Sequence, residues 1–154
     1  MKHLIPEFER MFQRYPAEFR SSLVIPCLHR IQQDRGYIAD SDIDGLVEYL
    51  GVPRIQVEEV LSFYTMFRRK PIGRHHVEVC RNVSCSLRGA ERLIGHLQDK
   101  LGVKPGETTP DGRFTLATCE CMGSCGTAPM MVVDGAYHEN LSIEKVDRIL
   151  GGLD

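Results

Sequence analysis

Six cysteines are the residues best suited to chemistry in this sequence, and four of them form two spaced pairs. Four residues separate Cys80 from Cys85, three separate Cys121 from Cys125, and 35 residues lie between the pairs. Four thiolates are a ligand set of iron–sulfur clusters, and a [2Fe-2S] centre needs two thiolates on each iron. The spacing therefore favours one [2Fe-2S] cluster held by Cys80, Cys85, Cys121 and Cys125.

Other four-cysteine sites match the spacing less well. Structural zinc uses closer pairs such as CxxC, so CRNVSC and CMGSC are a looser match, and zinc stays open as an alternative. A plant-type ferredoxin would place CxxC soon after CxxxxC, and a Rieske centre would need two Cys–His pairs. The sequence has neither arrangement, and it lacks the CxxC of a thiol–disulfide oxidoreductase.

The remaining candidate groups favour structural roles. Cys119 lies two residues before Cys121, and we expect a half-buried small side chain rather than a substitute ligand. Cys27 falls on an apolar helical face, where core packing explains it. The six histidines show no metal-type spacing. No catalytic triad, phosphate-binding glycine loop or catalytic carboxylate pair is recognisable, so this chain alone has no complete active site and its chemistry would be the cofactor's.

The first seventy or so residues predict successive helices. Apolar residues recur at helical spacing between residues 17 and 34, where Pro26 should kink the helix or mark its start. Ser41 with Asp44 resembles a capping box that opens a short helix, and that helix should stop near Gly51.

A change of period follows the basic stretch at residues 68–74. From residue 76 the pattern predicts the order β-α-β-β-α, with a helical stripe from Leu87 to Leu101 and a hairpin turn at Asp134-Gly135. We therefore expect an α/β protein with a helical bundle over residues 1–72 and a mixed domain over residues 73–154. Both cysteine pairs follow a predicted strand, so their sulfurs should gather at one end of the sheet.

Two further segments have plain interpretations. Arg68, Arg69, Lys70 and Arg74 are typical of a solvated linker rather than a docking site. The segment SFYTMF, residues 62–67, most simply belongs to the core, with enough bulk to seal an interface between lobes or with a partner.

Composition narrows the class of protein. The chain has 154 residues, 42% hydrophobic and 26% charged, with a formal net charge of −2. That charge offers no attraction for nucleic-acid phosphates. No apolar stretch reaches the roughly 20 residues of a membrane span, and charges stand where a signal peptide needs its apolar run. We expect a cytoplasmic protein without direct membrane insertion, in which cysteines indicate metal or redox chemistry rather than disulfides.

Beyond these patterns, the sequence resembles the thioredoxin-like [2Fe-2S] ferredoxin family that includes the E subunit, the 24 kDa type, of bacterial NADH-quinone oxidoreductase (respiratory complex I). The resemblance covers nearly the whole chain. It rests on DRGYI at 34–38, SFYTMF at 62–67, VEVCRNVSC at 77–85, LGVKPGETTPDGRF at 101–114 and ECMGSCGTAPM at 120–130.

The resemblance implies both a fold and a role. It implies an N-terminal helical bundle before a thioredoxin-like domain, with Cys80, Cys85, Cys121 and Cys125 binding one [2Fe-2S] cluster and Cys119 outside the ligand set. It also implies a partner flavoprotein subunit that binds FMN and NADH and exchanges single electrons with the cluster. The complex would be cytoplasmic and peripheral to the inner membrane.

The same cysteine pattern is compatible with other proteins. Soluble NAD-linked hydrogenases and formate dehydrogenases use an equivalent subunit, and a zinc-stapled structural adaptor is a more remote alternative. Thioredoxin-like folds often carry a cis proline before a strand, so we expect a cis bond between Ala128 and Pro129.

Overall fold

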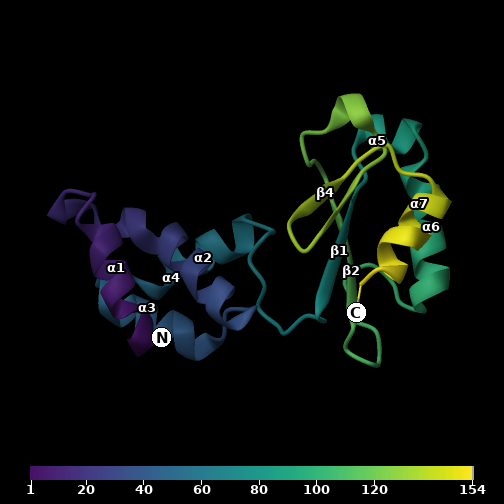
Figure 1. The fold of residues 1–154 in the computed structure, drawn as a ribbon. Helices are drawn as coiled ribbons and strands as arrows, with labels where there is room; N and C mark the ends of the chain where they lie inside the picture. The colour runs from purple at the N-terminus through teal and green to yellow at the C-terminus, as the bar shows by residue number, and fades with distance from the viewer. Residues whose placement is uncertain (154) are drawn as a thin grey trace. The chain divides into compact units, whose positions relative to one another are not determined.

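The computed structural model describes residues 1–153, which form two compact units. The first unit is Met1–Pro71 and the second begins at Ile72. The boundary drawn from the sequence, after residue 72, lies one residue later than this division. Figure 1 shows helices alone in the first unit and a sheet with helices in the second.

The first unit is a bundle of short helices around one apolar core. Its elements are η1 (Lys2–Leu4), α1 (Ile5–Phe12), η2 (Ala17–Leu23), α2 (Val24–Arg35), α3 (Asp40–Leu50) and α4 (Arg54–Phe63). Phe8, Leu28, Ile43, Leu46 and Val57 are fully buried and come from four different helices. Because each helix buries only one stripe of side chains, the bundle is stable only when these stripes meet.

Helix ends in this unit follow backbone chemistry, with one correction. Pro26 lies in the first turn of α2 and so marks its start, where a missing N–H is tolerated. Gly51 ends α3 with φ of 67°, as predicted. The Ser41–Asp44 capping box was wrong, because α3 begins at Asp40 and the Asp42 carboxylate accepts the Ala39 N–H at 3.0 Å.

The aromatic segment SFYTMF is only partly core. Phe67 is buried, but Phe63 is 77% exposed and Met66 43% exposed. The helix α4 ends at Phe63, so the residues after it no longer follow helical spacing and do not share one face. Arg69, predicted to lie in a solvated linker, pairs with Asp40 at 2.5 Å and Glu58 at 2.7 Å.

The second unit is a four-stranded sheet with helices packed on it. Its elements are β1 (His75–Cys80), α5 (Val83–Leu87), α6 (Ala90–Leu101), β2 (Phe114–Cys119), η3 (Cys125–Thr127), β3 (Met131–Val133), β4 (Ala136–His138) and α7 (Ile143–Gly151). The strand order is β2-β1-β3-β4. β1 and β2 are parallel, and the pairs β1–β3 and β3–β4 are antiparallel. The predicted α/β class is confirmed. The predicted order β-α-β-β-α was incomplete, because the segment after the Asp134-Gly135 turn forms a fourth strand, β4, and a separate short helix, α5, precedes α6.

Alternation along the strands gives the sheet two different faces. Val77 and Val79 on β1 and Met131 and Val133 on β3 share a buried cluster with side chains of α6 and α7. Both helices lie on the same side of the sheet in Figure 1, and His96 and Lys100 of α6 both pair with Asp147 of α7. Cys80, one residue after Val79, therefore belongs to the opposite face.

Turns in this unit match most expectations. Asp134 and Gly135 both have positive φ, 51° and 86°, as a type I′ hairpin requires. The Ala128–Pro129 bond is cis, as predicted. The helical stripe, however, does not include Leu87, because Gly89 with φ of 96° separates α5 from α6 and Leu87 is exposed. Across residues 1–153, no helix combines the length and apolar character that crossing a bilayer requires.

Candidate iron–sulfur site

Five cysteines lie at or just beyond the ends of the two parallel strands. β1 ends at Cys80 and β2 at Cys119, and these two residues are register partners. Cys85 lies in α5, immediately after β1, while Cys121 and Cys125 lie in the loop and short η3 helix after β2. Parallel strands have their carboxyl ends at the same edge of a sheet. The two cysteine pairs therefore lie at the same edge of the sheet.

Burial divides the proposed ligands into two classes. Cys80 and Cys85 are buried in one small apolar cluster with Met130, and Cys119 packs against that cluster. Cys121 and Cys125 are exposed. One pair is thus fixed by core packing, and the other sits in a surface loop.

Backbone and side-chain bonds join the segments that carry the two pairs. The Arg81 N–H donates to the Cys119 carbonyl at 2.9 Å, extending the β1–β2 ladder by one step. The Arg81 guanidinium contacts the Glu120 carboxylate at 2.7 and 2.8 Å. The Gly123 N–H donates to Cys121 Sγ at 3.4 Å, at a residue whose φ of 73° favours glycine. Backbone N–H bonds of this kind stabilise negative charge on sulfur.

The thiols are close enough to affect one another electrostatically. Burial raises the pKa of the Cys85 thiol, a hydrogen bond with Cys80 and the charge of Cys125 raise it further, and a backbone bond from Met130 lowers it. Burial also raises the pKa of Cys119 to about 12, with contributions from Glu78, Cys80 and Cys121. Cys85 and Cys119 are thus the two thiols of the site whose pKa is raised, in both cases first by burial.

The donor set fits a cationic iron–sulfur group. A buried thiolate beside a second thiolate is unfavourable, and bound metal ions remove that repulsion by their own charge. Within residues 1–153, no three His, Cys, Asp or Glu side chains converge as they would around a single ion. A [2Fe-2S] cluster takes four thiolates, and the two spaced cysteine pairs supply that number.

The other candidate residues lie elsewhere, in structural settings. Cys27 is fully buried in the core of the first unit, as predicted, and burial raises its pKa to about 12. His3, His75 and His96 each pair with one aspartate at 2.7 to 2.9 Å. These contacts agree with the structural roles expected from the sequence.

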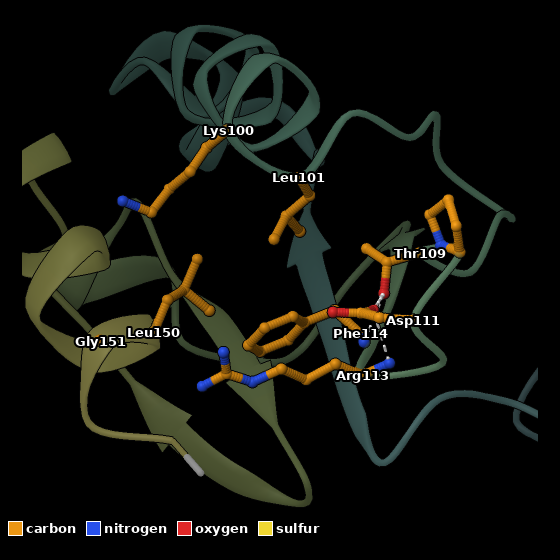
Figure 2. Close-up of a pocket in the computed structure, with 9 residues that line it drawn as sticks. Lys100, Leu101, Thr109, Asp111, Arg113, Phe114, Leu150 and Gly151 are labelled. Atoms are coloured by element: carbon orange, nitrogen blue, oxygen red, sulfur yellow. Dashed lines mark hydrogen bonds between the residues drawn. The ribbon is translucent and has the colours of Figure 1, made fainter.

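A pocket that sequence reasoning did not single out lies at the other end of the sheet, where β2 begins. It encloses about 560 Å³ and is lined by residues that include Lys100, Arg113, Phe114 and Leu150. Figure 2 shows the Arg113 side chain extending beside the Phe114 ring, and its guanidinium carbon lies 5.0 Å from the ring centre. No cysteine lines this pocket, so it is separate from the candidate site.

Comparison with known families decides the class of protein. The family model described as "Thioredoxin-like [2Fe-2S] ferredoxin" matches residues 8–154. The chain belongs to this family. The thioredoxin-like [2Fe-2S] ferredoxin fold and a cofactor prediction of one [2Fe-2S] cluster are thereby confirmed.

Relatives of this ferredoxin carry the names of NADH-quinone oxidoreductase subunits. It is 44% identical to the second E subunit of NADH-quinone oxidoreductase in Rhizobium meliloti (strain 1021), over 94% of this chain and 84% of that protein. It is 40% identical to NADH-quinone oxidoreductase subunit 2 of Thermus thermophilus, over 94% and 81%. The predicted resemblance to the E subunit is confirmed.

A solved structure shares the fold of this ferredoxin. A chain of an NAD+-reducing [NiFe]-hydrogenase in the H2-reduced state aligns with a TM-score of 0.73 at 22% identity, covering 84% of this chain and 22% of that one. At that identity the likeness shows the fold alone.

Proposed function

We propose that this ferredoxin is the electron-transfer subunit of an NADH:quinone oxidoreductase, with one [2Fe-2S] cluster bound by Cys80, Cys85, Cys121 and Cys125. The observation that supports the proposal is that the two cysteine pairs follow the same ends of the paired strands β1 and β2, in a chain of this family. Relatives at 40 to 44% identity, which carry the name of that enzyme's subunit, support the assignment of the complex.

The side chains around the site have distinct tasks in this proposal. The bound cluster would supply one-electron redox chemistry. Cys80 and Cys85, packed against Met130, keep water from one side of the site. Cys121 and Cys125, which are exposed, leave the other side open to a redox partner. The Gly123 N–H, bonded to Cys121 Sγ, stabilises the thiolate and the additional electron.

We infer that the redox partner is a flavoprotein subunit that binds FMN and NADH. The relatives are named as subunits of NADH-quinone oxidoreductase, and this chain contributes thiols but no recognisable nucleotide-binding loop. Contact with the inner membrane, on its cytoplasmic face, would then come through other subunits of the complex.

The alternatives have weaker support. An equivalent subunit of a soluble NAD-linked hydrogenase or formate dehydrogenase is compatible with the hydrogenase likeness, which extends only to the fold. A zinc-stapled adaptor does not agree with membership of a [2Fe-2S] ferredoxin family.

Purification of the tagged chain from its own host tests the assignment. We expect a reddish-brown protein with about two irons and two sulfides per chain, an EPR signal on reduction, and a co-purifying flavoprotein that contains FMN and oxidises NADH. Colourless protein containing zinc would contradict the electron-transfer role. Co-purification with hydrogenase subunits would contradict the assignment to NADH:quinone oxidoreductase and leave the cluster itself in place.

A further inference from the structure

Cys119 is a fifth thiol at the site, left over when the two spaced pairs supply four ligands. It is the register partner of Cys80 across the parallel strands β1 and β2. Register partners on neighbouring strands lie about 4.8 Å apart and project their side chains from the same face of the sheet. The Cys119 side chain is half-buried against the cluster of side chains that contains Cys80 and Cys85.

The backbone holds Cys119 in place beside Cys80. Cys119 is the last residue of β2, and its carbonyl accepts the Arg81 N–H at 2.9 Å. The Cys119 side chain also packs against the small buried cluster that contains Cys80. This thiol is thus fixed next to a sulfur that the proposed function assigns as a ligand.

Binding of iron changes which of the two sulfurs can donate. As a protonated thiol, Cys80 donates its S–H to the Glu120 carbonyl at 3.9 Å. As a ligand, Cys80 is a thiolate with no proton, so its sulfur can only accept hydrogen bonds. The register partner on β2, Cys119, keeps its S–H and can serve as a donor to that sulfur.

We propose that Cys119 is a positioning residue that donates its S–H to the Cys80 ligand sulfur and thereby raises the reduction potential of the cluster. Reduction adds negative charge to the cluster and its ligands, so a donor bonded to a ligand sulfur stabilises the reduced form more than the oxidised form. The inference rests on the proposed function, because it needs Cys80 to be a ligand. It adds a residue that sets the potential without binding iron.

Redox titration of the cluster-loaded chain, followed by EPR, tests the inference. Cys119→Val keeps a side chain of similar size but removes the hydrogen-bond donor. Cys119→Ala removes both the bulk of the side chain and the donor. Each variant should retain the iron and sulfide content of the unmodified chain and show a more negative midpoint potential. Cys119→Ser, which retains an O–H donor, should restore the potential toward that of the unmodified chain. Cys27→Ala is the matched control at the buried cysteine of the first unit, and its potential should not change.

A spectroscopic measurement separates hydrogen bonding from packing. After exchange into deuterated water, pulsed EPR of the reduced protein should detect coupling to an exchangeable hydrogen that disappears in Cys119→Val and is present in Cys119→Ser. Packing alone would not produce that difference.

Different results would contradict the role of Cys119 and the proposed function. An unchanged potential in both Cys119→Val and Cys119→Ala, with the cluster intact, would overturn only the role of Cys119. Loss of iron from both variants would instead make Cys119 a ligand and overturn its role as a donor. An unmodified chain that holds zinc or no iron would overturn the proposed function and this inference together.

Discussion

Met130 packs the two buried ligands of the site, and its truncation should weaken their hold on iron. The side chain is fully buried with Cys80 and Cys85, and its carbonyl accepts the Cys80 N–H at 3.2 Å. Met130→Ala removes three buried heavy atoms at roughly 0.8 kcal/mol each, and the cavity left behind brings the expected loss of stability to about 3 kcal/mol. For a unit of this size, that loss lowers the melting temperature by roughly 12 to 24 °C.

Met131 provides a matched control for this experiment. It is the next residue, equally buried, but its side chain belongs to the cluster on the helix-covered face. Met131→Ala should lower the melting temperature by a similar amount. If half of the roughly 3 kcal/mol lost in Met130→Ala favours local opening of the site, the opening equilibrium shifts about tenfold. Iron release should then accelerate about tenfold in Met130→Ala and not in Met131→Ala.

The assay is loss of visible absorbance from the cluster-loaded chain in excess iron chelator, well below either melting transition. Circular dichroism during heating gives the two melting temperatures. Equal rates of iron release from Met130→Ala and Met131→Ala would refute the reasoning, because they would show that packing around Cys80 and Cys85 does not retain the metal.

Two further predictions concern the first unit. Asp42→Ala removes the acceptor for the Ala39 N–H and the partner of Arg35. The free energy of unfolding in urea should therefore fall by about 1 kcal/mol. A larger loss in Asp42→Asn than in Asp42→Ala would count against the cap. The pKa of the Cys27 thiol rises from 9.0 to about 12 on folding. The buried, protonated Cys27 thiol therefore contributes fully to the free energy of unfolding below pH 9. This contribution is lost as pH rises toward 12, because the unfolded chain releases the proton first. Between pH 7 and pH 10 the unmodified protein should lose about 1 kcal/mol that Cys27→Val does not lose, and equal losses in both proteins would contradict this account.

The placement of the two cysteine pairs after neighbouring strands was predictable because it depends on patterns that span many residues. Alternating strands ending at Cys80 and Cys119, each followed by a cysteine loop, place the thiols at one edge of a sheet whatever the details of the loops. The hairpin at Asp134 depends on local chemistry that the sequence displays, whereas the cis bond before Pro129 was expected from the resemblance to thioredoxin-like folds.

Errors arose where one residue changes the register of a helix. Ser41 and Asp44 have capping-box spacing, but α3 begins earlier and Asp42 reaches back to the cap. In the sequence, Leu87 continues the apolar spacing of α6. In the structure, Gly89 ends the helical path before α6, and the Leu87 side chain is exposed.

The role of Cys119 could not be assigned from spacing either. Its distance along the chain from Cys121 suggested that these two residues share a strand face. The strand ends at Cys119, and the relevant neighbour is Cys80 on the adjacent strand. Pairing between strands follows from tertiary structure, which a local pattern does not encode.

Iron and sulfide content of single Cys→Ser variants tests the ligand assignment most directly. Serine replacement at Cys80, Cys85, Cys121 or Cys125 should each abolish or severely destabilise the cluster, whereas Cys119→Ser and Cys27→Ser should keep about two irons and two sulfides per chain. A full complement in Cys121→Ser, or an empty site in Cys119→Ser, would contradict the assignment of these four thiols as the ligands.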